Sequence, residues 1–255
     1  MGDPDRVLVL TPVKDAAPHL DRYLALLDAL EHPRDRLSLG LLESDSDDGT
    51  YAVLAARRAD LERRYARVTL LRHDFGFAVP FGAPRWSAPV QLPRRVVLAK
   101  SRNRLLFGAL RDEDWVLWID VDLDSYPPDV LARMLATGKD IVQPHCVVEP
   151  GGRTFDWNAW REQGRVHMDQ LRGGPDLVRL DAVGGTMLLV RADLHREGLV
   201  FPTFLYGRES PFGRDPTPLV GHGRGEVETE GLGLMAKDMG RQCWGMPNLE
   251  IVHRA

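Results

Sequence analysis

The sequence lacks the features that mark disulfide-rich or membrane-spanning proteins. It has only two cysteines, Cys146 and Cys243, in 255 residues, which excludes a disulfide framework and favours a reducing compartment. It also has no run of about 18 apolar residues, the length that a transmembrane helix requires. Residues 1–6 are short and acidic, unlike a signal peptide. We therefore expect a soluble, cytoplasmic protein, although a chain trimmed of a membrane anchor would look the same.

A strong charge of one sign and internal repetition are also missing. The formal net charge is -4, so no basic field draws the chain to nucleic acid or anionic lipid, and we expect no nucleic-acid partner. The sequence contains no internal repeat or low-complexity tract. The hydrophobic fraction of 44% and the charged fraction of 27% are ordinary for a globular protein. A chain of this length can bury a substantial core.

The first third of the chain alternates apolar runs with amphipathic segments. Apolar runs predict buried strands at 6–10, 37–42 and 68–71, and helical spacing predicts helices at 20–30 and 50–65. The first strand is expected to stop at Thr11-Pro12. Because strand–helix–strand order requires crossover connections, the sheet should be parallel. The predicted fold class is therefore α/β, with a Rossmann-like, mostly parallel sheet flanked by helices.

The pattern continues through the middle of the chain and then loosens. Residues 73–93 are rich in Pro, Gly and aromatics and are expected to form a functional loop or lid. Further elements are expected as follows: helices at 94–110, after Pro127-Pro128 and at 231–239; strands at 115–119, 141–144, 186–190 and 249–253; and a loop at 207–225 containing Arg208, Arg214 and Arg224. We interpret 1–255 as one domain, with a nucleotide-binding half at 1–144 and an acceptor-side half at 145–255.

The strongest chemical signal is Asp120-Val121-Asp122, which follows the apolar run 115–119. Open parallel sheets bind ligands outside the carboxyl ends of their strands. Hard cations such as Mg²⁺ or Mn²⁺ often bridge carboxylates and a diphosphate. The alternative is a solvated, acidic strand end. A phosphatase with an aspartyl nucleophile would carry such acids after its first strand, and their place after about the fourth strand counts against that enzyme.

Two further segments carry groups that suit a nucleotide. Asp45 lies in the turn 44–50 after the second predicted strand and could accept hydrogen bonds from a base or ribose, whereas Asp47 and Asp48 are expected only to cap the next helix. Arg102 and Asn103 lie within an otherwise apolar helix. The guanidinium could bind a diphosphate, or it could belong to a solvated basic face.

The second half of the chain offers three more candidates. Glu228 and Glu230 precede the last predicted helix, where they could face the reacting sugar or activate a hydroxyl, or could simply interact with the helix dipole. Gly184-Gly185 could allow close approach to a ligand, or could form a turn. His253 follows the last strand and could ligate Mn²⁺, although a terminal histidine is usually solvated.

Taken together, these segments resemble one known family. The matching segments, in order, are Leu10-Thr11-Pro12, 41–50, 93–103, 115–122, 180–186 and 228–237. They resemble the fungal mannan-polymerase mannosyltransferases of glycosyltransferase family 62, over residues 7–253. The resemblance implies a GT-A glycosyltransferase fold, a GDP-mannose donor, Mn²⁺ or Mg²⁺ as the cofactor, and a retaining transfer that forms an α-mannoside.

The resemblance also implies a role for individual residues. It places the metal chiefly on Asp122, with His253 as the second protein ligand and Asp120 at the same site, where it helps to hold the donor. It assigns donor binding to Thr11, Pro12, Asp15, Asp45, Arg102, Asn103, Asp120, Gly184 and Gly185. It assigns catalysis to Glu228 and Glu230, together with Asp122.

Two departures from the family leave the acceptor open. Family members are typically Golgi proteins with an N-terminal membrane anchor, and this sequence shows no such segment. The stretch 205–227 is also longer here than in the family pattern. The Ala-, Arg- and Asp-rich composition suggests a bacterial source, so the acceptor could be a glycan, a small metabolite, a lipid-linked sugar or a peptide. Two alternatives remain at this point: a transferase for another UDP- or GDP-sugar, and a non-catalytic nucleotide-sugar-binding module. The oligomeric state is not predicted.

Overall fold

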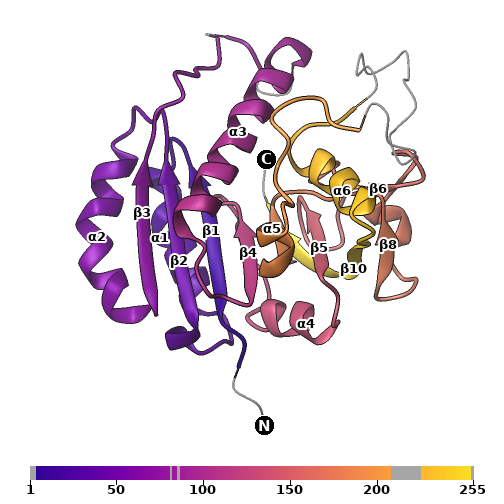
Figure 1. The fold of residues 1–255 in the computed structure, drawn as a ribbon, viewed down its shortest axis with the longest axis horizontal. Coiled ribbons are helices and arrows are strands. Elements are labelled where there is room, and N and C mark those ends of the chain that lie inside the picture. The colour runs from indigo at the N-terminus through magenta and orange to yellow at the C-terminus, as the bar shows by residue number, and fades with distance from the viewer. Residues whose placement is uncertain (1–3, 81, 85–86, 208–224, 254–255) are drawn as a thin grey trace.

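A single eight-stranded sheet runs through both halves of the chain (Figure 1). The computed structural model describes residues 4–80, 82–84, 87–207 and 225–253. The strand order is β3-β2-β1-β4-β9-β5-β10-β8. The strands are β1 Val7–Val13, β2 Leu37–Glu43, β3 Arg67–Arg72, β4 Trp115–Ile119, β5 Ile141–Val147, β8 Val178–Leu180, β9 Met187–Arg191 and β10 Cys243–Val252. Only β8 and β9 run against the other six, so the sheet is mixed but mostly parallel, as predicted.

Helices cover both faces of this sheet. One face carries α1 Leu20–Asp28, α2 Thr50–Arg64 and α4 Val130–Ala136, and the other carries α3 Ala88–Ala109, α5 Ala192–Arg196 and α6 Glu228–Asp238. Short 3-10 turns lie at Ala17–His19, Arg34–Arg36 and Met168–Leu171, and a small hairpin pairs β6 Trp160–Arg161 with β7 Val166–His167. Among the described residues, no helix is both long and apolar enough to cross a membrane.

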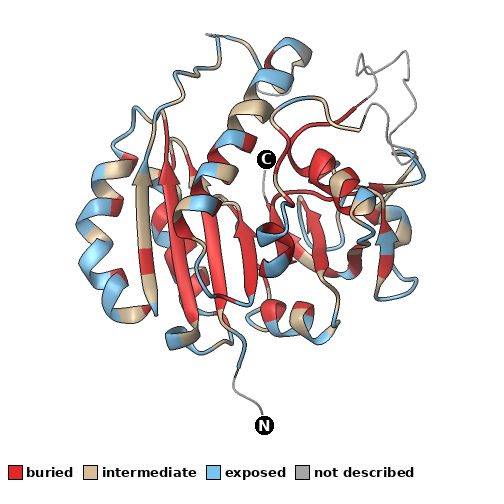
Figure 2. Cartoon of the chain, viewed as in Figure 1, coloured by how far each residue is buried: buried red, intermediate tan, exposed pale blue. Residues whose placement is uncertain are grey.

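The alternation of side chains along the strands produces two separate cores. In β1, Val7 and Val9 pack into the core beneath α1 and α2, whereas Leu8 and Leu10 pack into the core beneath α3. This follows from the two-residue period of a strand, which sends successive side chains to opposite faces. Figure 2 shows the central strands almost entirely buried, with most of the exposed residues on the outer surfaces of the helices and in the loops.

The first strand does not stop at Pro12, so that prediction was wrong. β1 continues to Val13 along β2, but its pairing with β4 ends at Leu10. Beyond Leu10 the strand keeps only one neighbour, which is the situation of an edge strand, where a residue without an N–H is tolerated. The Thr11 hydroxyl donates to the carbonyl oxygen of Ile119 at 2.7 Å and links β1 to β4 where their ladder ends.

Several predicted boundaries also need correction. α3 begins at Ala88 rather than at 94, because Pro89 suits the first helical turn and the helix tolerates Pro93 in its interior. α6 begins at Glu228 rather than at 231, so its acidic residues lie inside the first turn. β5 extends past 144, and β10 begins at Cys243, with an irregularity after Met246. Residues 208–224, including Arg208, Arg214 and Arg224, lie outside the described residues.

Candidate functional site

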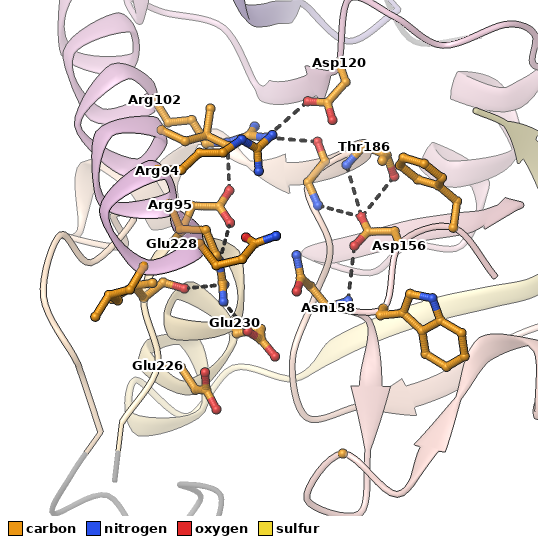
Figure 3. Close-up of a pocket in the computed structure, with 18 of the residues that line it drawn as sticks. Arg94, Arg95, Arg102, Asp120, Asp156, Asn158, Thr186, Glu226, Glu228 and Glu230 are labelled. Carbon is orange, nitrogen blue, oxygen red and sulfur yellow. Dashed lines mark hydrogen bonds and ion pairs between the residues drawn. The ribbon is translucent and has the colours of Figure 1, made fainter. Parts of the chain in front are cut away.

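A cavity of about 610 Å³ lies beyond the carboxyl end of β4. It is bounded by α3, by the first turn of α6 and by the segment 155–158 that follows β5 (Figure 3). Its charged lining consists of Asp120, Asp156, Glu226, Glu228, Glu230, Arg94, Arg95 and Arg102. Five carboxyl groups therefore face three guanidinium groups, and the cavity suits an anionic ligand only if a further cation accompanies it.

Arg102 is the central charge of this cavity. Its side chain is 1% exposed and lies 5.3 Å from the ring centres of both Trp118 and Phe201. Its guanidinium lies 3.2 Å from an oxygen of Asp120 and 3.1 Å from an oxygen of Glu228. It also donates to the carbonyl oxygen of Gly185, so three separate elements are connected through one side chain. The predicted solvated basic face is wrong for Arg102, because this side chain is buried.

A second arginine, Arg95, joins the two acids in the first turn of α6. Arg95 lies 2.7 Å from Glu230 and 3.6 Å from Glu228, and the indole N–H of Trp160 donates to Glu230 at 2.6 Å. Burial would lower the pKa of Arg95, but the charges of Glu230 and Glu228 outweigh it and raise the pKa. Glu228 adopts φ 56, a left-handed conformation that directs its carboxylate to both arginines. The two predicted catalytic acids are thus held in a buried ion-pair network.

Sequence reasoning missed Asp156, which fixes the glycine segment before β9. Its carboxylate accepts the backbone N–H of Gly185 at 2.9 Å and the hydroxyl of Thr186 at 3.1 Å. Burial raises its pKa. A Cβ atom on Gly184 would overlap this carboxylate, which explains why a glycine stands there. The backbone N–H groups of Gly184 and Gly185 need hydrogen-bond acceptors when they are buried, and this need was the sequence signal for a residue such as Asp156.

The predicted metal ligands are only partly brought together. His253 Nε2 lies 3.1 Å from Asp122 Oδ1, and the imidazole stacks on Phe155 with ring centres 3.8 Å apart. Burial would raise the pKa of Asp122, but its interactions with His253 outweigh it and lower the pKa. Asp120 faces Arg102 instead, and burial raises the pKa of Asp120 to about 7 although the Arg102 charge opposes this. Within the described ranges, no three potential ligand residues form a ready metal cluster.

The turns after β1 and β2 hold one another in place. The backbone N–H of Asp15 donates to the Ser46 hydroxyl at 2.9 Å, and the N–H of Asp47 donates back to the Asp15 carboxylate at 3.0 Å. Neither Thr11, Pro12 nor Asp15 lines the cavity. Their predicted contact with a nucleoside remains a prediction, and these turns lie at the same sheet edge as Asp120.

Asp45 is engaged by the backbone of the next loop. With φ 54, it accepts the N–H groups of Phe75 at 3.0 Å and Gly76 at 2.8 Å. These bonds tie the end of β2 to the chain leaving β3, and a contact of Asp45 with the nucleoside remains a prediction. Asp48 accepts the N–H of Thr50, the first residue of α2, at 2.9 Å, but it also accepts the N–H of Ala17 at 2.9 Å, so the prediction that it only caps the helix was wrong.

The side chain of Asn103 forms hydrogen bonds with the backbone of Phe201. Its side-chain amide donates to the Phe201 carbonyl oxygen at 2.7 Å and accepts the Phe201 N–H at 2.9 Å. Both ends of the amide therefore hold the segment that packs on Arg102, and Asn103 does not line the cavity. Of the other predicted residues, Arg102, Asp120, Gly185, Glu228 and Glu230 line the cavity, and Gly184 lies beside Asp156.

The structure is similar to solved glycosyltransferases. The mannosyltransferase PcManGT from Pyrobaculum calidifontis, in complex with GDP-Man and Mn²⁺, matches with a TM-score of 0.57 and 20% identity, covering 98% of this chain and 56% of that one. GalNAc-T7 with UDP, GalNAc and Mn²⁺ matches with a TM-score of 0.60 and 12% identity, covering 98% and 44%. At these identities the likeness concerns the fold alone, and it confirms the predicted GT-A fold.

Two mannan-polymerase subunits are similar to this chain in sequence. The Mannan polymerase II complex anp1 subunit of Schizosaccharomyces pombe is 29% identical over 293 residues, and the ANP1 subunit of Saccharomyces cerevisiae is 27% identical over 292. Each match covers 98% of this chain, which spans 64% and 55% of those two proteins. The sequence pattern of the Anp1 family matches residues 1–173 and 162–205, well over half of the chain. The chain therefore belongs to the Anp1 family.

Proposed function

We propose that this chain is a metal-dependent mannosyltransferase that transfers mannose from GDP-mannose to an acceptor hydroxyl with retention, forming an α-mannoside. The observation that carries this proposal is the placement of Arg102 and Asp120 in a cavity beyond the end of β4, with Asp122 and His253 paired at the same sheet edge. Family membership and the GT-A fold support the reaction class. The relative with bound GDP-Man and Mn²⁺ supports the donor and the metal.

The Asp122–His253 pair fits a divalent cation. A carboxylate oxygen and an imidazole nitrogen 3.1 Å apart form a mixed oxygen and nitrogen donor set that suits Mn²⁺. Two protein ligands are enough when diphosphate oxygens complete the coordination. When bound, the cation would neutralise the charge that develops on the departing nucleoside diphosphate.

The protein's own groups then hold the reacting centres. Phe155 fixes the plane of the His253 imidazole, and Asp156 fixes the backbone of Gly185 at the cavity wall. Arg102 adds a fixed positive charge beside Asp120. Because these groups are oriented before the ligand arrives, the protein contributes chiefly positioning and preorganised electrostatics.

The way in which the acids of the cavity are engaged supports a transfer on one face without a covalent intermediate. Asp120, Glu228 and Glu230 are each engaged by a guanidinium, and Asp156 is engaged by backbone N–H groups. We therefore assign Glu228 and Glu230 to the positioning of Arg95 and Arg102. In this scheme the acceptor hydroxyl attacks the sugar from the side on which the diphosphate leaves.

Replacement of Asp122 by alanine tests the metal assignment. Loss of a direct ligand should weaken Mn²⁺-dependent GDP binding by at least the roughly 10- to 100-fold that second-shell changes cause, and should abolish transfer. Titration calorimetry of GDP with and without Mn²⁺ measures the effect. Asp60→Ala, an exposed site on α2, is the matched control and should bind like the parent chain. Full activity in the Asp122→Ala variant would remove the central assignment.

A donor panel tests the sugar and the base. Thermal-shift measurements with Mn²⁺ and GDP-mannose, GDP-fucose, UDP-glucose or UDP-N-acetylglucosamine should show the largest stabilisation with GDP-mannose. Preferential stabilisation by a UDP-sugar would contradict the GDP-mannose assignment. Donor binding with neither transfer nor hydrolysis over a broad acceptor panel would favour a non-catalytic binding module.

A further inference from the structure

The segment 155–158 presents three consecutive side chains in three directions. Phe155 stacks on His253, with an angle of 12° between the ring planes. Asp156 is anchored to Gly185 and Thr186, and it also accepts the N–H of Asn158 at 3.2 Å. The backbone on both sides of Trp157 is therefore fixed, and the direction of its indole is set by its neighbours.

Trp157 is a large apolar side chain that the fold leaves uncovered at the cavity wall. Its relative exposure is 53%, and it lines the same cavity as Asp120 and Arg102. His167, from the hairpin strand β7, contacts the indole edge-on with ring centres 4.7 Å apart. An exposed indole that already packs against His167 and stands on a fixed backbone loses little conformational entropy when a ligand stacks on it.

Polar side chains that have no partner among the described residues share this cavity with the indole. Gln91 and Arg94 line it from α3, and Asn158 lines it from the segment that carries Trp157. Figure 3 shows Arg94 and Asn158 on opposite walls. Within the described part of the chain, these three side chains form no hydrogen bond or ion pair. Planar amide and guanidinium groups beside an aromatic surface suit a ligand with both an apolar face and hydroxyl edges.

We propose that Trp157, together with Gln91, Arg94 and Asn158, forms a binding platform for a neutral hexopyranose of the acceptor. The C–H face of such a ring stacks on the indole, and its hydroxyls bond to the polar groups. We expect a neutral ligand because Asp120, Glu228 and Glu230 are already engaged by guanidinium groups and Asp156 by backbone N–H groups. This inference rests on the proposed function, since the acceptor must lie beside the sugar held near Asp120.

Ligand-detected NMR tests the platform directly. Saturation transfer from the chain of residues 1–255, with GDP and Mg²⁺ present, is measured for methyl α-D-mannopyranoside and methyl β-D-glucopyranoside. We expect the parent chain to bind at least one of these probes, and Trp157→Ala to reduce its affinity roughly 5- to 10-fold. Trp157→Phe, which keeps an aromatic face, should retain most of the affinity. Phe107→Ala, which also removes an aromatic ring but at a 65% exposed position on α3, should match the parent chain.

Two outcomes would overturn the platform. One is that the parent chain transfers saturation to neither probe, and the other is that Trp157→Ala binds as well as the parent chain. Melting temperatures check that the variants are folded, and the change at Trp157 should be small because the side chain is half exposed. The calorimetric GDP titration with Mn²⁺ on the parent chain separates the two proposals. Normal GDP binding without any effect at Trp157 removes only the platform, whereas loss of GDP binding removes the transferase assignment.

Discussion

A guanidinium that is 1% exposed cannot be hydrated, so the protein must balance its charge. For Arg102 the balance comes from Asp120 and Glu228, with the Gly185 carbonyl oxygen as a further acceptor. Trp118 and Phe201 fix the plane of the group from the surrounding core. The charge that would meet a ligand at Asp120 is therefore also a structural charge, and its removal affects both stability and binding.

Replacement of Arg102 by methionine is expected to destabilise the chain. Asp120 and Glu228 would lose their shared counter-ion, and breaking a buried ion pair typically costs about 3–5 kcal/mol. Urea denaturation measures the free energy of unfolding. Arg104→Met, at an exposed position on the same helix, should change it by less than about 0.5 kcal/mol. Equal stability of the two variants would show that Arg102 does not balance the acids.

The variant Glu228→Gln distinguishes a positioning role of Glu228 from a role in proton transfer. In Glu228→Gln, Arg95 and Arg102 keep a polar neighbour of the same size but lose one negative charge. We expect kcat/KM to fall by up to about 100-fold as the guanidinium groups shift, while the pH profile of the remaining activity keeps its shape. Glu250→Gln, which removes a charge from the ion pair with Arg172 outside the cavity, is the matched control. Loss of one limb of the profile would identify Glu228 as an acid or base instead.

At the scale of elements, the site depends on how closely the segment 184–186, which precedes β9, packs against the segment 155–158. Gly184→Ala is expected to destabilise the chain by about 1–3 kcal/mol, because the new Cβ atom would overlap the Asp156 carboxylate. Gly174→Ala is the control, since the nearest atom to its added Cβ would be the Leu171 carbonyl oxygen at 3.2 Å. Thermal and urea denaturation of both variants measure the difference. A neutral effect at Gly184 would mean that Asp156 moves without cost.

The elements that can be predicted from sequence are those with a strong pattern of apolar residues over a short stretch of chain. The apolar run at 115–119 matches β4 at both ends, and the acids that follow it lie at the predicted sheet edge. The start of α3 was missed because Pro89 and Pro93 suggest a loop, although the first allows a helix to begin. Asp156 was missed because its partners lie about 30 residues away, and no local period marks such a contact. The elements could thus be predicted from sequence, whereas the pairing of the buried charges depends on tertiary contacts.

At the scale of the whole molecule, both halves of the chain contribute to each of the two cores, and the core beneath α3 lies against the cavity. β4, from the first half, contributes Trp118, and the second half contributes Phe201 and His195, which pack edge-on or stacked against one another. The same two rings, Trp118 and Phe201, hold Arg102. A change that loosens this core would therefore reach the cavity without touching any residue that lines it.

Lowering the pH should loosen this core by favouring protonation of His195. Burial lowers the pKa of His195 from 6.5 to about 4, although its hydrogen bond to the Leu199 carbonyl oxygen opposes this. Between these two values the unfolded chain binds a proton that the folded chain excludes, so this contribution to stability is lost as the pH falls through that range. The linkage predicts a loss of about 2 kcal/mol between pH 7 and pH 5 from this residue alone.

Urea denaturation at pH 7 and pH 5 measures that loss, with His195→Asn as the comparison. The asparagine amide can keep the bond to Leu199 but cannot titrate, so the variant should be moderately less stable at pH 7 and should lose about 2 kcal/mol less than the parent chain on acidification. Other titrating groups affect both chains alike, and the difference between the chains therefore isolates the imidazole. If both chains lose the same stability, His195 takes up its proton without disturbing the fold. The core that joins the two halves would then not be the route by which acid reaches the cavity.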